Sequence, residues 1–169
     1  MPRLVDYQII NLCETGMVTP FDPAMVNPAS LDVRLGDTLL IERAGDPEMV
    51  PYPLHGHSEQ NPYLLVPGQF VLAPTPEWFE LPPTIEAQFA LKSSRAREGL
   101  QHLLAGYCDP GWHGVLTMEL KNIRQLHPIA VWPGMRIGQM KFTEVPRPRA
   151  DYSLTGRYHG DSKVQGSKG

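Results

Sequence analysis

The chain has 169 residues and a formal net charge of −3 at pH 7. This length predicts one domain, and the small negative charge argues against nucleic acid as a partner, because a face that binds a polyanion needs many cations. No stretch has the roughly 20 apolar residues of a membrane span, and the N-terminus lacks the apolar run of a signal peptide, so we expect a cytoplasmic protein without membrane contact.

The chain contains 18 prolines and 15 glycines, which are spread over its whole length. Proline interrupts helices and central strands, so we expect short strands between turns and a mainly β fold. Apolar residues are too frequent for disorder except at the end of the chain. The sequence therefore predicts one domain over residues 1–145 and a polar C-terminal tail over residues 146–169.

Residues 6–15 form the one clear predicted helix. Asp6 is its expected cap, and Ile9 and Cys13 recur at a helical spacing that faces a core. Cys13 and Cys108 are the two cysteines, and their wide separation is typical of reduced thiols. A loop punctuated by proline is expected over residues 17–28.

Residues 30–36 alternate between polar and apolar side chains, which predicts a half-exposed strand. On its polar face we expect Asp32 and Arg34 to form an ion pair, with a structural role for Asp32. A second strand is expected over residues 38–41.

Residues 44–62 are rich in glycine, proline and histidine and predict a loop. Within it, the segment from His55 to Glu59 suggests a metal site. The flanking prolines favour a surface loop instead, and no further histidine or cysteine lies at the spacing of a structural metal site. We therefore predict no metal ligands in the chain.

The remaining elements are predicted strands joined by Pro-Gly turns at 67–68, 110–111 and 133–134. Residues 77–82 read as an amphipathic connector, and two strand–turn–strand units are expected, at 63–73 and 129–142. The predicted strands cover residues 63–66, 69–73, 85–91, 114–120, 129–132 and 135–142.

Two groups of residues carry chemistry. The cluster from Lys92 to Arg97 combines hydroxyls and cations, which suits a multiply charged anion. Glu119 stands between Met118 and Leu120 in a predicted strand, so it shares a face with Thr117 rather than with its apolar neighbours. If that face lines a pocket, burial raises the pKa of Glu119 and suits it to moving protons.

Three segments, at 91–97, 104–114 and 118–122, resemble the dCTP deaminase family of the dCTP deaminase/dUTPase superfamily. That family has G-[RK]-S-S-x-[AG]-R, [TS]-A-x-x-I-D-P-G-[WF]-x-G and L-E-x-x-N in this order, and residues 29–36 and 132–140 resemble it too. The resemblance implies a distorted β-barrel or jelly-roll of the dUTPase-like (β-clip) type, with one N-terminal helix and short helical turns. It also implies a homotrimer with active sites shared between subunits.

The resemblance implies catalytic roles for three residues. Glu119 matches the glutamate that activates water and shuttles protons. Ser93 and Arg97 match the residues that position the water and orient the glutamate. Lys92 and Ser94 match contacts to the phosphates of the nucleotide.

Further residues match the substrate-binding positions of the family. Asp109 matches the residue that accepts a hydrogen bond from the deoxyribose 3′-OH, and the main chain near Ala105 and Gly106 is expected against the base. In the tail, three residues align with a tyrosine, a lysine and a glutamine that close over the nucleotide: Tyr152, Arg157 and Asp161. An acid at position 161 would repel a triphosphate unless it is turned away.

The implied cofactor is Mg²⁺ carried by the nucleotide phosphates. Zinc is not expected, because the H-x-E…P-C-x-x-C signature of zinc deaminases is absent. The implied substrate is dCTP, and the preferred product at this point is dUTP with release of ammonia.

Two alternatives stay open. Gly106 stands where the dUTP-releasing enzymes have histidine. The bifunctional enzymes that form dUMP and pyrophosphate have glycine at this position, which favours dUMP formation here, although Leu104 replaces their usual threonine. A non-catalytic nucleotide-binding regulator on the same fold is the other alternative. Retention of Glu119, Ser93 and Arg97 argues against a regulator, because binding alone does not need all three.

Overall fold

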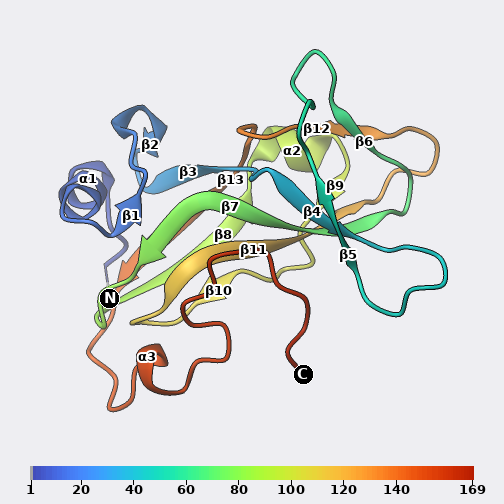
Figure 1. The fold of residues 1–169 in the computed structure, drawn as a ribbon. Helices are drawn as coiled ribbons and strands as arrows, with labels where there is room; N and C mark the ends of the chain where they lie inside the picture. The colour runs from blue at the N-terminus through green and yellow to red at the C-terminus, as the bar shows by residue number, and fades with distance from the viewer. Residues whose placement is uncertain (1) are drawn as a thin grey trace.

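The computed structural model describes residues 2–169, and within them the chain is mainly β (Figure 1). Its elements in chain order are α1 (Asp6–Glu14), β1 (Val18–Thr19), the 3-10 helix η1 (Pro23–Met25), β2 (Val26–Asn27), β3 (Ser30–Arg34), β4 (Thr38–Ile41), β5 (Val50–Pro53), β6 (Tyr63–Leu65), β7 (Phe70–Glu80), β8 (Ile85–Leu91), α2 (Ser93–Arg97), β9 (Leu100–Gln101), β10 (Tyr107–Cys108), β11 (His113–Asn122), β12 (Ile129–Val131), β13 (Arg136–Glu144) and α3 (Tyr152–Thr155).

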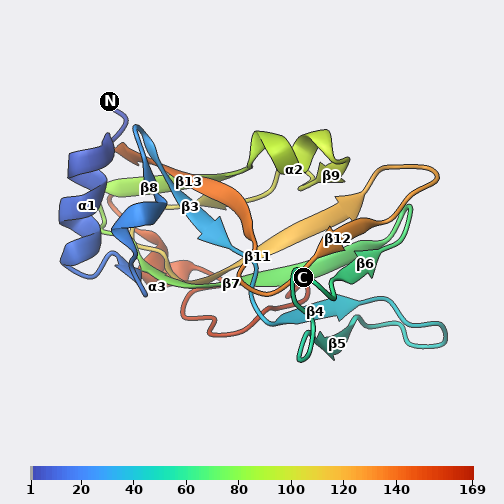
Figure 2. The same cartoon turned by 90° about the horizontal axis from the view of Figure 1, so that it is seen from above.

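Three sheets organise these strands. One runs β5-β4-β7-β11-β9, with β1 added beside β7, the second runs β10-β8-β13-β3-β2, and β12 pairs with β6 as a third. The sheets are open, and α1 covers one end of the molecule beside β1, β2 and β3 (Figures 1 and 2). The predicted β class with one N-terminal helix and short helical turns is confirmed.

The long antiparallel pair of β7 and β11 is the frame of the first sheet. Its register runs from His113 opposite Glu80 to Lys121 opposite Phe70, with an irregularity between Val115 and Thr117. The expected connector at 77–82 is therefore wrong for residues 77–80, which belong to β7.

A side chain explains how β7 continues through two prolines. Pro74 and Pro76 have no N–H to give to the ladder. Thr75 lies between them and is buried, and its Oγ1 accepts a hydrogen bond from Leu116 N at 3.0 Å. This bond joins β7 to β11 at the irregularity, so the strand persists where composition predicts a break.

The two expected strand–turn–strand units have their turns but are not hairpins. Gln69 N donates to Val66 O at 3.0 Å and Met135 N to Trp132 O at 3.2 Å, which closes both Pro-Gly turns. The strands on either side then diverge: β6 pairs with β12, β7 with β11, and β13 with β8 and β3. Turn chemistry predicts the reversal of the chain, but not which strand each arm joins.

Residues 44–62 contain one strand that the sequence does not predict. This strand, β5, pairs with β4 at the edge of its sheet and carries Pro51 and Pro53, which an edge strand tolerates. Both ring nitrogens of His57 are within hydrogen-bond distance of chain groups, Nε2 at 3.3 Å from Tyr52 OH and Nδ1 at 3.2 Å from Asn61 O. His57 thus holds the loop together.

The predicted helix is confirmed as α1, with Ile9 and Cys13 buried. Its cap differs from the prediction, because the N-cap residue is Val5 and the side chain of Gln8 accepts a hydrogen bond from Val5 N at 3.2 Å. The expected loop at 17–28 contains the short strands β1 and β2 and the turn η1.

The expected Asp32–Arg34 pair is wrong. Asp32 is only 2% exposed, and its carboxylate accepts hydrogen bonds from Lys92 Nζ at 2.6 Å and Asn27 Nδ2 at 2.8 Å. Arg34 instead pairs with Glu77 of β7, with Nε 2.7 Å from Oε1. The polar face of β3 is buried against other elements, so each charge finds a partner outside its own strand.

Both cysteines are buried and unpaired in the described part of the chain, and burial raises the pKa of each thiol to about 12. No helix within residues 2–169 combines the length and the apolar character needed to cross a membrane.

The core is built from fully buried side chains of both large sheets and α1, among them Phe79, Phe142, Ile9, Leu35, Leu39, Met118, Leu120, Ile137 and Met140.

Candidate active site

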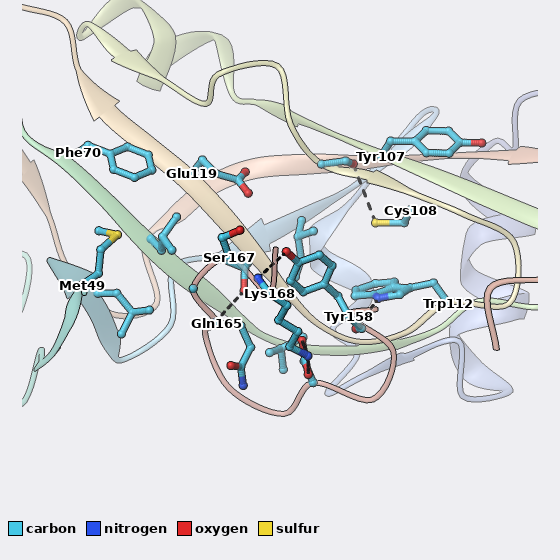
Figure 3. A pocket seen from close by; sticks show the side chains of 18 of the residues that line it. Met49, Phe70, Tyr107, Cys108, Trp112, Glu119, Tyr158, Gln165, Ser167 and Lys168 are labelled. Atoms are coloured by element: carbon cyan, nitrogen blue, oxygen red, sulfur yellow. Dashed lines mark hydrogen bonds and ion pairs between the residues drawn. The ribbon is translucent and has the colours of Figure 1, made fainter. Parts of the chain in front are cut away.

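A cavity of about 940 Å³ opens on the face of β7 and β11 that carries Glu119. We call it the Glu119 cavity. Its walls come from five parts of the chain: Leu40 of β4, the β7–β11 face, the loop before β5, the segment around β10, and the C-terminal tail. Figure 3 shows Glu119 between Phe70 on one side and the main chain of Tyr107 on the other, with Ser167 of the tail beside its carboxylate.

The side chains of β11 alternate as predicted. Leu116, Met118 and Leu120 are buried, whereas Thr117 and Glu119 are partly exposed and line the cavity. Opposite Glu119 in the ladder is Leu72 of β7, so the carboxylate has an apolar neighbour on its own face. Desolvation by burial raises the pKa of Glu119, while a backbone hydrogen bond and the charge of His102 oppose the rise.

Gly106 lines the cavity immediately before β10. Its φ is +107°, and a Cβ built there would lie 2.6 Å from the Cβ of Phe89. Phe89 N also donates to Gly106 O at 2.9 Å, which fixes the main chain against β8. Only glycine fits this close approach without strain, so the sequence keeps bare main chain on the cavity wall.

The loop from His102 to Ala105 leads into this wall. His102 Nδ1 lies 3.2 Å from Ala105 O, and the ring packs edge-on against Phe89 at a centroid distance of 5.4 Å. His102 is a candidate site residue that the sequence analysis does not single out. A histidine in the loop after a two-residue strand gives no pattern in the sequence, and only the fold brings it close to Glu119.

The tail lies along β11 and closes one side of the cavity. Val115 N donates to Asp161 O, Gly160 N donates to His113 O, and each of these distances is 2.9 Å. The indole Nε1 of Trp112 donates to Tyr158 O at 3.2 Å. These bonds add the tail to the edge of β11 as a short irregular strand.

The acid at position 161 has a partner. Lys168 Nζ lies 2.6 Å and 2.8 Å from the two carboxylate oxygens of Asp161, and it is 5.2 Å from the ring centroid of Tyr158. The repulsion expected between Asp161 and a triphosphate is therefore offset by a neighbouring cation. Lys168 and Tyr158 are cavity residues that the sequence analysis does not single out, because the tail has no periodic pattern.

The sequence-predicted site residues fall into two groups. The Glu119 cavity brings together Glu119, Gly106, Asp109, Tyr152 and Asp161. Ala105 directly precedes Gly106 in the chain. Arg157 is exposed, and its carbonyl accepts a hydrogen bond from Lys168 Nζ.

The second group belongs to α2 and does not line this cavity. Ser93, Ser94 and Arg97 are exposed, and Lys92 is bound to the buried carboxylate of Asp32. Figures 1 and 2 both place α2 away from the tail and α3. One chain thus presents the Glu119 carboxylate and the basic cluster at 92–97 on separate surfaces.

Within residues 2–169, no three histidine, cysteine or acidic side chains come together as a metal-binding group.

The family model described as dCTP deaminase-like matches residues 3–145. A Methanosphaerula palustris protein named "dCTP deaminase, dUMP-forming" is 37% identical over 98% of this chain and 91% of its own length. A protein of the same name from Acidothermus cellulolyticus is 39% identical over 92% of this chain and 85% of its own.

Among solved structures, the 2′-deoxycytidine 5′-triphosphate deaminase of Agrobacterium tumefaciens superposes with a TM-score of 0.68 at 25% identity. The match covers 83% of this chain and 47% of that longer chain. With a family model that spans the domain and relatives matched over nearly their full length, the chain belongs to the dCTP deaminase-like family.

Proposed function

We propose that this protein deaminates dCTP and hydrolyses the product to dUMP and pyrophosphate. One dCTP and two waters give dUMP, pyrophosphate and ammonia. From the sequence motifs alone, dUTP is the expected product. The relatives named for dUMP formation favour the alternative, because they match this chain at 37–39% identity over most of its length.

The observation that carries the proposal is the placement of Glu119. Its carboxylate lies in a cavity, opposite an apolar side chain, and its pKa is raised. A carboxylate with a raised pKa is a stronger base, so it takes a proton from water more readily. In the proposed step the water oxygen bonds to C4 of cytosine, and Glu119 passes the proton to the amino group. The C4–N bond then breaks and ammonia leaves.

The second step needs space and an oriented water beside the α-phosphorus. Gly106 leaves that wall of the cavity without a side chain, and Asp109 is a carboxylate on the same wall. We assign Asp109 to orient a water towards the α-phosphorus. The new P–O bond gives dUMP, and the bond to the β-phosphate oxygen breaks with pyrophosphate as the leaving group.

A shared active site in a homotrimer is part of the proposal. Ser93, Ser94 and Arg97 are exposed on α2, away from the Glu119 cavity of the same chain. Arginine and hydroxyls of this kind suit phosphates, and they can meet a nucleotide in the cavity only if α2 comes from another subunit. Lys92 is paired with the buried carboxylate of Asp32. In this arrangement it would lie beside the phosphates as part of that ion pair and not as a free cation.

Mg²⁺ would reach the site on the nucleotide and neutralise part of the phosphate charge. The residues of the chain would then bind the complex of metal and nucleotide. Asp161 is held by Lys168 in the present arrangement, so in the proposed site Asp109 is the carboxylate that faces the phosphates.

The test of the proposal is Glu119→Gln, with Glu48→Gln as the matched control. Both are glutamates on the wall of the cavity, but Glu48 is exposed. Loss of a general acid–base group costs about 10²–10⁴ in rate, so Glu119→Gln should still bind dCTP and lose turnover, while Glu48→Gln remains active. Deamination by Glu119→Gln at the wild-type rate would refute the mechanism.

Mixing two inactive variants tests the shared site. Arg97→Ala and Glu119→Gln proteins, dissociated and reassembled together, should recover part of the wild-type activity, because some sites then combine an intact Arg97 with an intact Glu119. Activity that stays at the level of the separate variants, with mixed oligomers formed, would contradict sharing.

A further inference from the structure

Two histidines face each other where the tail docks on the sheet. His113 begins β11, and His159 lies in the tail after α3. Their ring centroids are 3.5 Å apart, with 41° between the ring planes. The indole of Trp78 stacks on His113 at 5.7 Å, and the ring of Tyr152 lies 6.3 Å from that of His159. We call His113 and His159 the histidine pair.

The histidine pair belongs to the contacts that hold the tail on β11. The main-chain oxygen of His113 accepts a hydrogen bond from Gly160 N at 2.9 Å, and Asp161 O also bonds to β11. Tyr158 directly precedes His159, and both Tyr158 and Asp161 line the Glu119 cavity. A repulsion between the two rings would therefore move the part of the tail that walls the cavity.

The surroundings of His159 suit a neutral ring. Its Nδ1 is buried and has no hydrogen-bond partner within residues 2–169. A neutral imidazole can leave one nitrogen without a proton, so Nδ1 then buries only a lone pair. An imidazolium carries a proton on both nitrogens and would bury a donor without an acceptor, which costs free energy.

Two carboxylates lie near the histidine pair, and both are engaged elsewhere. Asp151 is the N-cap of α3 and accepts a hydrogen bond from its main chain at 3.2 Å. Glu80 stands opposite His113 in the β7–β11 ladder and accepts a hydrogen bond from Trp78 Nε1 at 3.2 Å. Desolvation by burial and the neighbouring His113 lower the pKa of His159, whereas Asp151 opposes this shift. The carboxylates thus weaken the preference for a neutral ring without cancelling it.

From this geometry we propose that the histidine pair is a pH-sensitive latch for the tail. With both rings neutral, the tail stays docked on β11 and closes its side of the cavity. Protons on the rings place like charges in contact and bury an unpaired donor, so the docked tail loses stability. The latch itself follows from the packing of the tail, and its effect on substrate binding rests on the proposed function.

Proton linkage gives the direction and size of the effect. The docked tail disfavours protonation, so it binds fewer protons than the released tail. Docking is therefore strongest above the ordinary histidine pKa of about 6.5 and weakens as the pH falls below it. Full exclusion of one proton would lower the docking constant about tenfold between about pH 7.5 and pH 5.5, and partial exclusion about threefold or more.

Amide hydrogen exchange on the full-length protein measures docking without a nucleotide. Val115 N and Gly160 N are donors in the contact between tail and β11, so their exchange reports release of the tail. The wild type is compared with His159→Phe at each pH, because a comparison at one pH cancels the intrinsic effect of pH on exchange. Phenylalanine keeps a ring in place and takes up no proton. Relative to this variant, the wild-type protection should fall about three- to tenfold between about pH 7.5 and pH 5.5.

Two further variants complete the test. His55→Phe is the matched control, since His55 is exposed in the loop before β6, and it should behave as the wild type. His113→Phe removes the proton acceptor from the β11 side, so the test stands even if a change at position 159 disturbs the tail. Wild-type protection that is unchanged by pH after correction for intrinsic exchange would overturn the inference. So would a loss in both His159→Phe and His113→Phe equal to that of the wild type.

Binding of dCTP then separates the latch from the proposed function. Calorimetry uses Glu119→Gln, which has no titrating carboxylate at position 119, with and without His159→Phe. The affinity should fall about three- to tenfold more over this pH range in the protein with the intact histidine pair; an equal fall in both would contradict control of substrate binding by the latch. Release of the tail at low pH in a protein that neither binds nor deaminates dCTP would refute the proposed function and leave the latch standing. Deamination of dCTP with docking independent of pH would refute the latch alone.

Discussion

Replacing Gly106 by alanine tests the structure of the cavity wall. The residue has φ +107°, where an L-side chain is strained, and such a conformation costs roughly 1–2 kcal/mol. The added Cβ would also lie 2.6 Å from the Cβ of Phe89, which is 3% exposed and packed in the core. Overpacking of this kind costs about 1–3 kcal/mol. The two effects together predict a loss of about 2–5 kcal/mol.

Thermal unfolding at fixed protein concentration measures this loss. For a chain of this size, about 1 kcal/mol lowers Tm by about 2–4 °C, so Gly106→Ala should lower it by about 4–20 °C. The matched control is Gly68→Ala, because Gly68 has φ +81° but nothing within 4 Å of a built Cβ. It should show the conformational part alone, about 2–8 °C.

The outcome separates two accounts of Gly106. A Tm for Gly106→Ala equal to that of Gly68→Ala would mean that the wall next to Phe89 can move aside, and would refute the close approach described above. A large loss confirms that glycine is required by packing, whatever its part in the reaction.

Three further predictions concern the site. Because the pKa of Glu119 is raised, the carboxylate should already be protonated at a pH above the ordinary pKa of a glutamate, so kcat/KM for dCTP should begin to fall there as the pH is lowered. A kcat/KM that stays constant down to the ordinary glutamate pKa would contradict the role of Glu119 as a base. Deleting residues 146–169 should raise KM for dCTP far more than it lowers Tm, and an unchanged KM would exclude the tail from substrate binding. Activity should survive a zinc-specific chelator, whereas activity that tracks about one zinc per chain would contradict the proposed chemistry.

Much of the fold can be predicted from the sequence where one periodicity dominates. The alternation in residues 114–120 predicts a strand and the face of Glu119; both are confirmed, and the strand extends over His113–Asn122. The turn residues Pro67-Gly68 and Pro133-Gly134 predict reversals of the chain, and these are present. Local chemistry decides both features, so a local pattern is enough.

Features decided by distant partners could not be predicted. Proline at 74 and 76 argues for a break in β7, but Thr75 bonds to Leu116 across the sheet and the strand continues. Asp32 and Arg34 look like partners in sequence, yet their ion pairs are with Lys92 and Glu77. In each case the deciding contact joins residues about forty or more positions apart.

The candidate site shows the same division. Glu119, Gly106 and Asp109 could be predicted from motifs, and one cavity brings them together. Lys168 and Tyr158 could not, because they gain their role from the fold of the tail over β11. The catalytic assignment of Ser93 and Arg97 stays a prediction, since one chain holds them away from the cavity.

The central claim is that one active site takes dCTP to dUMP. The most direct measurement is a time course of dCTP consumption in which dUTP, dUMP and pyrophosphate are separated and quantified, with Glu119→Gln as the blank. The proposal predicts that dUMP and pyrophosphate appear in equal amounts from the first time point, without accumulation of dUTP. Stoichiometric dUTP with no pyrophosphate would contradict it and restore plain deamination as the activity.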